Sequence, residues 1–388
     1  MTAGAPHRPG VDGWAEPRFA AVASAFRRNF TDHGEVGAAV SVWHDGREVA
    51  SLWGGLADPP TGRPWSPDTI ALVFSMTKAL STTAVFHLAE RDGIPLDRPI
   101  CDYWPEFGRA GKETITLRHV LSHRAGLPVI DGDFDLGSVL AWEPVIRALE
   151  AQRPVWRPDG DHGYHIRTFS WLVGEAFRRC AGTTVGAYFA AEIAAPLGLD
   201  WHLGLTGAQE DRAASIIPPG LEYFRYWASL PEESLLRRAG AAPGGLFKYD
   251  SMWNESRLRT TELCSSNSYA TAGGVARLYA ALLGFGDLTS PLGEAALADA
   301  RTRRSRGPDA VLEIDTDFGS GFHLAGSLGV RVGASSFGHA GAGGSLGFAD
   351  PDHGLAFAYV PNRLYFGLRP DPRTDGLLSA VYDCVARV

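Results

Sequence analysis

The 388-residue sequence contains few lysines and has no long apolar run. Three of its 36 basic residues are lysines (Lys78, Lys112 and Lys248), and 44 acidic residues bring the net charge to −8. A chain of negative net charge is a poor electrostatic match for nucleic acid or an anionic membrane, so neither is expected as a partner. The sequence contains no run of about 18 apolar residues, the length that a helix needs to span a bilayer. Residues 1–6 lack the basic and apolar regions of a signal peptide, and we therefore expect a cytoplasmic protein.

Cysteine is also scarce, and its spacing excludes the common metal motifs. The four cysteines form no C-x-x-C pair and lie about 80 to 120 residues apart, too far for a zinc site. His162 and His165 form a close pair but have no third ligand at suitable spacing. The sequence therefore predicts buried thiols in a reducing compartment, no metal and no cofactor.

Strand patterns occur at both ends of the chain and helical patterns between them. Segments 37–43 and 48–53 alternate around Asp45-Gly46, a hairpin signal, and 345–349 and 355–360 form a second pair. The expected helices are 17–30, 75–91, 117–122, 139–151, 169–180, 185–195, 273–283 and 374–385. This order predicts an α+β fold, in which both termini build an antiparallel sheet flanked by helices. Residues 1–74 and 315–388 would form the sheet domain, 75–314 a large, mostly helical inserted domain, and the active site would lie between them.

The segment 75–78, Ser-Met-Thr-Lys, has the form S-x-x-K at the start of a predicted helix. Three residues along a helix place Lys78 beside Ser75. A serine hydroxyl needs a neighbouring base to become a nucleophile, and lysine can act as that base when burial makes it neutral. The small residues that follow Lys78 suit a buried helix, so the pattern predicts a nucleophile and its base.

Three segments in this order resemble a known family. They are Ser75-Met76-Thr77-Lys78, the LAERDGIPL segment at 88–96, and the LSHRAGL segment at 121–127. Together they resemble the serine β-lactamase and penicillin-binding-protein superfamily, and within it the class C β-lactamase-like (family VIII) carboxylesterases. The resemblance extends over about residues 35 to 365 and implies a β-lactamase-like fold.

The resemblance also implies a second catalytic group, a tyrosine in a Y-x-N-type motif. Here Tyr164-His165-Ile166 follows Pro158-Asp159-Gly160. By the resemblance, Tyr164 would share a proton with Lys78 as general base and acid. Ile166 departs from the lactamase pattern, because an apolar side chain cannot bind a substrate amide. We assign Ile166 to the substrate-binding residues.

The third element of the family is a K-T-G-type triplet on a strand that faces the nucleophile. The matching residues are His339-Ala340-Gly341. His339 would bind substrate or Tyr164 but is mostly neutral near pH 7, so a fixed cation for a substrate carboxylate is missing. The resemblance implies an oxyanion hole formed by the N–H groups of Ser75 and Ala342, with Gly341 among the substrate contacts.

Two further patterns in the sequence have a possible role in the site. Residues 343–347 match the G-x-S-x-G nucleophile motif, but a strand follows where a helix is required, which argues against Ser345 as nucleophile. The aromatic segment 223–227, expected to be a loop, and Trp253 would either line an acyl pocket or pack within the helical domain.

The predicted function is a serine carboxylesterase that forms an acyl-serine intermediate on a small-molecule ester. The alternatives are an acyltransferase that passes the acyl group to an amine or alcohol, a β-lactamase or D-amino-acid peptidase, and a catalytically silent binding protein on this fold. No sequence feature predicts an oligomeric state.

Overall fold

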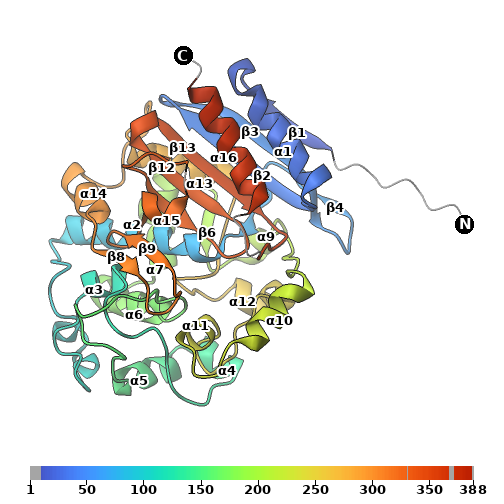
Figure 1. Cartoon of the computed structure of the whole chain (residues 1–388). Coiled ribbons are helices and arrows are strands. Elements are labelled where there is room, and N and C mark those ends of the chain that lie inside the picture. The colour runs from blue at the N-terminus through green and yellow to red at the C-terminus, as the bar shows by residue number, and fades with distance from the viewer. Residues whose placement is uncertain (1–9, 330, 367–370, 387–388) are drawn as a thin grey trace, which may run out of the picture.

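The computed structural model describes residues 10–329, 331–366 and 371–386, and a ten-stranded antiparallel sheet lies at its centre (Figure 1). The strands of this sheet follow the order β1-β3-β2-β13-β12-β11-β10-β9-β8, with β4 paired to β3. A small second sheet has the order β5-β7-β6. The strands are β1 (Val11–Ala15), β2 (Gly37–His44), β3 (Arg47–Asp58), β4 (Arg63–Pro64), β5 (Ala71–Leu72), β6 (Trp201–Leu203), β7 (Ser268–Ala270), β8 (Ser305–Pro308), β9 (Asp315–Phe318), β10 (His323–Leu324), β11 (Phe337–Ala340), β12 (Leu346–Asp350) and β13 (Leu355–Pro361).

Both ends of the chain meet in the middle of the large sheet. The β2–β3 hairpin forms at Asp45-Gly46 as predicted, and Asp45 adopts the positive φ that such a turn requires. The C-terminal hairpin β12–β13 is also present, and β13 pairs with β2 from Ala38 to His44. These pairings confirm the expected fold class. The sheet also includes β8, which lies before residue 315.

Helices α1 (Ala20–Asp32) and α16 (Pro372–Val385) lie side by side on one face of this sheet (Figure 1). Their apolar faces bury Phe26 and Val381 against strand residues such as Phe357. A buried ion pair between Arg373 and Glu35, 3.0 Å apart, joins the C-terminal helix to the N-terminal part of the chain. The two termini are therefore fixed to each other by both apolar packing and charge.

The other face of the sheet carries α13 (Ala272–Leu282), and the remaining helices extend away from it. Helix α2 (Thr77–Asp92) is buried along most of its length and ends at Gly93, which adopts the left-handed conformation that terminates helices. The other helices are α3 (Leu117–Leu121), α4 (Leu136–Leu140), α5 (Glu143–Ala151), α6 (Phe169–Ala181), α7 (Val185–Phe189), α8 (Ala195–Leu197), α9 (Gly207–Glu210), α10 (Leu221–Ser229), α11 (Leu235–Gly240), α12 (Ser256–Arg259), α14 (Glu294–Arg301) and α15 (Ala325–Leu328).

Two sequence-based predictions are wrong in this region. The helix expected over 139–151 is broken at Trp142, which has a φ of 68°, and a new helix begins with Pro144 in its first turn. Proline has no N–H with which to continue the preceding helix, but it is tolerated at a helix start. The aromatic segment 223–227 is not a loop, because it forms most of α10.

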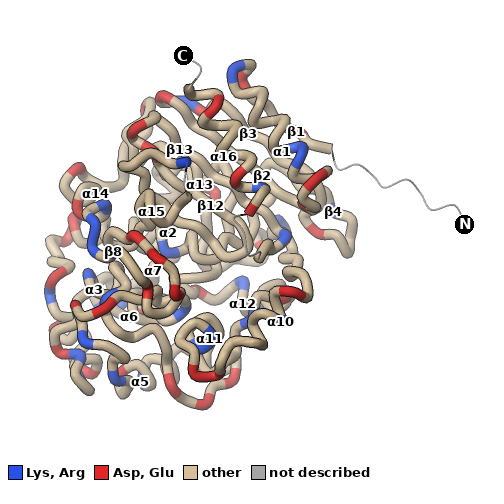
Figure 2. Tube along the Cα trace, viewed as in Figure 1, with Lys and Arg blue, Asp and Glu red and all other residues tan. Residues whose placement is uncertain are grey.

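Charged positions of both signs are interspersed over the surface in Figure 2. Many arginines are paired with carboxylates, as in the contacts of Arg303 with Asp317 and of Arg212 with Asp200. No helix within the described ranges is both long and apolar enough to cross a membrane.

Candidate active site

Ser75 lies in a short 3-10 turn, Phe74–Met76, directly before α2. The preceding residue, Phe74, has a φ of 44°, a conformation that costs a non-glycine residue about 1–3 kcal/mol. The Phe74 ring packs edge-on against Tyr249 and Trp253, which hold it in place. Ser75 is 9% exposed, and its position at the start of a helical turn leaves its N–H without an intrahelical acceptor.

Lys78 follows one turn later and is completely buried. Its Nζ lies 3.4 Å from Ser75 Oγ, and it donates hydrogen bonds to the carbonyl oxygens of Ile166 at 3.0 Å and Ser265 at 3.2 Å. Burial lowers the pKa of Lys78 well below its usual value, and the positive charge of Arg167 lowers it further. A neutral amine has two N–H groups and one lone pair. The two carbonyls take both hydrogens, so the lone pair is left for the Ser75 hydroxyl.

Tyr164 lies beside this pair, on the loop before α6. Its backbone N–H donates to the carboxylate of Asp309, and its ring stacks on Phe318. Lys78 Nζ lies 4.6 Å from the centre of the Tyr164 ring. Burial raises the pKa of Tyr164 strongly, while the nearby Ser75 hydroxyl acts in the opposite direction. Tyr164 is therefore a protonated phenol near neutral pH and can donate a proton.

Strand β11 and the turn after it form the opposite wall. The N–H of Gly341 donates to the carbonyl of Ser345 at 2.7 Å, which closes the turn that contains Ala342. Ser345 is itself buried, and its hydroxyl donates to the carbonyl of Val73 at 3.0 Å. This contact ties the turn to the strand end before Ser75. The serine of the G-x-S-x-G pattern therefore has a structural role in this protein.

A cavity of about 680 Å³ connects these elements. Of the predicted site residues it brings together Ser75, Tyr164, Ile166, Gly341 and Ala342. The rest of its lining is mostly aromatic and apolar. It consists of Glu222, Tyr223, Tyr226, Trp227, Leu236, Gly240, Tyr249, Leu312, His323, Ala340 and Phe366.

Two predicted substrate-binding residues lie outside this lining. Trp253 is completely buried, packs on Phe74 and Phe247, and donates from Nε1 to the carbonyl of Lys248. Trp253 therefore supports the cavity wall from behind. His339 is also completely buried, and its Nδ1 lies 2.7 Å from the carbonyl of Ala340. Burial lowers the pKa of His339 well below its usual value, so it is uncharged.

Four histidines lie around Tyr164, namely His123, His165, His323 and His339, and the sequence motifs assigned a role only to His339. The His123 ring contacts the Tyr164 ring at 4.6 Å between centres, and His123 Nδ1 accepts a hydrogen bond from the N–H of His165. His323 lies 5.9 Å from Tyr164. His123 lies in the LSHRAGL segment and His165 next to Tyr164 in its motif, whereas His323 belongs to no motif and reaches the site from β10.

The sequence left open whether the aromatic segment 223–227 lines an acyl pocket or packs within the helical domain, and the structure places Tyr223, Tyr226 and Trp227 in the cavity lining. Tyr223 and Trp227 are four residues apart and face the same side of the helix, with ring centres 5.9 Å apart. Pro218-Pro219-Gly220 precedes the helix and Pro231 follows it, so prolines mark both of its ends.

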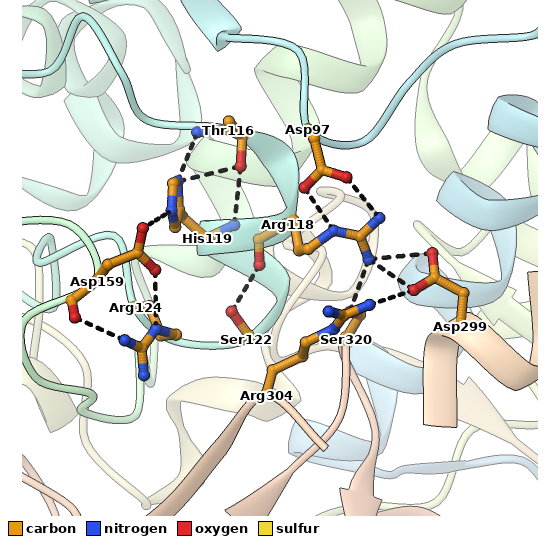
Figure 3. Close-up of polar contacts among 10 residues, drawn as sticks. All are labelled: Asp97, Thr116, Arg118, His119, Ser122, Arg124, Asp159, Asp299, Arg304 and Ser320. Atoms are coloured by element: carbon orange, nitrogen blue, oxygen red, sulfur yellow. Dashed lines mark hydrogen bonds and ion pairs between the residues drawn. The ribbon is translucent and has the colours of Figure 1, made fainter. Parts of the chain in front are cut away.

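A polar network on the outer side of the site fixes the segment that carries His123. Figure 3 shows Arg118 between two carboxylates, those of Asp97 and Asp299. His119 contacts Asp159 at 2.9 Å, and Arg124 donates to both the carboxylate and the carbonyl of the same residue. Because Asp159 lies five residues before Tyr164, this network links the positions of His123 and Tyr164.

Among the described residues, no group of three or more His, Cys, Asp or Glu side chains is arranged to hold a metal ion. The site chemistry visible in this part of the chain is that of a serine, an amine, a phenol and backbone N–H groups.

Residues 22–381 match the Beta-lactamase family model. The chain is 35% identical to the Esterase/beta-lactamase LipL of Mycobacterium tuberculosis over 380 residues, which cover 94% of this chain and 85% of that protein. It is also similar to the crystal structure of a penicillin-binding protein homologue from Caulobacter crescentus, with a TM-score of 0.85, 35% identity and coverage of 97% and 100%. The structure of a family VIII carboxylesterase gives a TM-score of 0.86 at 31% identity, with the same coverage. These matches confirm the family resemblance and the fold predicted from the sequence.

Proposed function

The chain belongs to the beta-lactamase family of serine hydrolases, and from this premise we propose that it is a carboxylesterase acting through an acyl-serine intermediate. The observation that carries the proposal is the composition of the cavity beside Ser75. The lining includes one acidic residue, Glu222, and neither lysine nor arginine among the described residues. An uncharged ester suits such a cavity better than a β-lactam, which carries a carboxylate.

Acylation begins at the pair Ser75 and Lys78. Neutral Lys78 takes the proton from the Ser75 hydroxyl, and Ser75 Oγ attacks the ester carbonyl. The alcohol leaves after it receives a proton from Tyr164, which is the protonated phenol in the site, and Lys78 returns that proton to Tyr164. The 3.4 Å separation of Lys78 Nζ from Ser75 Oγ supports this sequence of transfers.

Backbone N–H groups of Ser75 and Ala342 stabilise the developing oxyanion in this proposal. Both residues line the same cavity, and the Gly341–Ser345 hydrogen bond holds the turn that presents Ala342. Gly341 permits this close approach. A Cβ at that position would lie about 2.2 Å from the carbonyl oxygen of Val73.

We further propose that the protein works as the two units 1–74 with 315–388 and 75–314, with catalysis between them. The proposal is supported by the cavity lining, which contains residues from both units. Gly341 and Ala342 follow a strand of the large sheet, whereas Ser75, Tyr164 and α10 come from the inserted segment.

A chromogenic ester tests the proposal. Wild-type protein should hydrolyse p-nitrophenyl acetate, Ser75→Ala should lose that turnover, and nitrocefin should be hydrolysed much more slowly than the ester. Full activity in Ser75→Ala would overturn the assigned nucleophile. Faster turnover of nitrocefin than of the ester would instead assign the protein to the β-lactamases.

A further inference from the structure

His323 lines the catalytic cavity and belongs to none of the family motifs. It lies on the two-residue strand β10, between Phe318 of β9 and Gly338 of β11. Gly338 has no side chain, and a Cβ there would collide with Gly347 and Phe348 of the neighbouring strand. The His323 ring lies against the rings of His339 and Phe318, at 3.9 and 5.0 Å between ring centres.

Both ring nitrogens of His323 are buried and have no hydrogen-bond partner among the described residues. The other histidines near Tyr164 differ in this respect. His165 uses both nitrogens, with Nε2 accepting from the N–H of Leu127 and Nδ1 lying 2.8 Å from the carbonyl of Gly163. His123 accepts a hydrogen bond from the backbone of His165, and His339 contacts the carbonyl of Ala340. His339 Nε2 also lacks a partner, but His323 is the one of these four with both ring nitrogens buried and unpartnered. Because a buried polar group without a partner is costly, these nitrogens require a ligand.

The protonation state of His323 limits what that ligand can be. Burial lowers the pKa of His323 to about 3, so the ring is neutral near pH 7. A neutral imidazole has one N–H donor and one acceptor nitrogen. A hydroxyl group can accept from such a ring or donate to it, whereas a carboxylate can only accept and an ammonium group can only donate. Water and alcohols therefore fit this position in either tautomer.

His323 lies near Tyr164, where the water or alcohol that attacks the acyl-enzyme must bind. Its ring centre is 5.9 Å from that of Tyr164 and 3.9 Å from that of His339. Tyr164 and Ser75 line the same cavity, and the hydroxyl of Tyr164 also has no hydrogen-bond partner among the described residues. A water molecule held by His323 would therefore lie on the side of the site where Tyr164 can exchange a proton with it.

We propose that His323 is a catalytic residue that binds the water molecule attacking the acyl-enzyme, an inference that rests on the proposed esterase function. The water oxygen forms a bond to the acyl carbonyl carbon, and its proton passes to the Tyr164–Lys78 pair. The bond between that carbon and Ser75 Oγ then breaks, Ser75 Oγ takes the proton back, and the carboxylic acid leaves. An alcohol bound at the same place would form a new ester by the same steps.

His323 should act in deacylation and not in acylation, and mass spectrometry can follow both steps. After mixing with p-nitrophenyl acetate, the acetylated fraction of the intact protein is measured over time in wild type, His323→Phe and His323→Gln. Acetylation of His323→Phe should proceed at the wild-type rate, because p-nitrophenolate leaves without a proton. Loss of the acetyl group should slow about tenfold, the effect of losing one hydrogen bond worth about 1.4 kcal/mol. His323→Gln keeps a donor and an acceptor and should recover part of this loss.

An exposed histidine provides the matched control. His33 lies at the end of α1, and His33→Phe should leave both rates unchanged. Equal rates of acetyl loss in His323→Phe and wild type would overturn the proposal, as would equal slowing of both steps in the glutamine variant. The Ser75→Ala variant distinguishes a failure of the proposed esterase function from a failure of the proposed role of His323. If it still becomes acetylated and turns over, the proposed function fails, whereas loss of the adduct in Ser75→Ala leaves the His323 result as a test of His323 alone.

Discussion

Lys78 Nζ lies 3.0 Å from the carbonyl oxygen of Ile166, so the main chain of an apolar residue binds the amine that we propose as the base. The isoleucine side chain cannot bind a substrate amide as an asparagine would, but the backbone carbonyl of Ile166 binds the Lys78 amine. Together with the carbonyl of Ser265, it takes the two hydrogens of a neutral amine and orients the lone pair toward Ser75. The proposed role of Lys78 as base requires an amine that can lose its proton.

Lys78→Arg should therefore abolish esterase activity. Arginine stays protonated in proteins, so it cannot accept the proton of Ser75. Loss of a general base typically lowers the rate by about 10²–10⁴-fold. Steady-state kcat on p-nitrophenyl acetate measures this effect.

A second buried lysine offers the matched control. Lys112 is also completely buried and donates to two carbonyls, those of Glu150 and Gln152, but it lies outside the cavity. Lys112→Arg should lower the melting temperature and leave kcat unchanged. Retention of wild-type kcat in Lys78→Arg would contradict the role of Lys78 as base.

Arg167→Met should move the acid limb of the pH–rate profile to higher pH. The Arg167 guanidinium is buried against Tyr249 and Trp253, and its positive charge lowers the pKa of Lys78 in addition to the larger effect of burial. Removing the charge raises that pKa. Because only neutral Lys78 acts as base, activity appears at higher pH, and below the limb the rate falls about tenfold per pH unit. The measurement is kcat/KM between pH 5 and 9.

Arg167→Lys retains the charge and should keep the limb near its wild-type position. If both variants moved the limb equally, packing rather than charge would be the cause. If neither moved it, Arg167 would have no influence on the group that controls the acid limb.

The sequence motifs predicted the parts of the site that are local in the chain. Ser75 and Lys78 are one helical turn apart, and the hairpin at Asp45-Gly46 depends on two adjacent residues, so short segments contain enough information for both. His323 reaches the cavity only because β10 pairs with β9 and β11. Trp253 is kept out of the cavity lining because the Phe74 ring packs against it. Such positions depend on long-range packing, which spacing along the chain does not describe.

Ser345→Ala should weaken the site without removing the nucleophile. The variant loses the hydrogen bond to the Val73 carbonyl, which keeps the N–H of Met76 as a donor, at a cost of about 0.5–1.5 kcal/mol in stability. A fluorophosphonate probe should still label Ser345→Ala on Ser75, and kcat should fall much less than in Ser75→Ala. Loss of labelling in a folded Ser345→Ala protein would show that Ser345 is the nucleophile after all.

Tyr223→Ala should reduce the affinity for esters with an aromatic acyl group. The Tyr223 ring lies in the cavity wall, 4.3 Å from Phe366 and 5.9 Å from Trp227 between ring centres. An aromatic pair contributes about 0.5–1.5 kcal/mol beyond the burial of its area, so KM for p-nitrophenyl benzoate should rise several-fold. KM for the acetate ester should change little, because a methyl group does not reach this wall.

Gly341→Ala should impair catalysis, because the structure has no room for the added methyl group. The new Cβ would meet the carbonyl oxygen of Val73 and the hydroxyl of Ser345 at about 2.2 and 2.1 Å, so the turn carrying Ala342 must shift. The N–H of Ala342 then leaves its position in the oxyanion hole, and loss of one such donor lowers kcat by about 10²–10³-fold.

Gly273→Ala is the control, since a Cβ there meets nothing within 4 Å in the first turn of α13. That control should keep full activity and gain slightly in stability, because alanine favours a helix over glycine by up to about 1 kcal/mol. If Gly341→Ala retained wild-type kcat, the turn after β11 would not form the oxyanion hole.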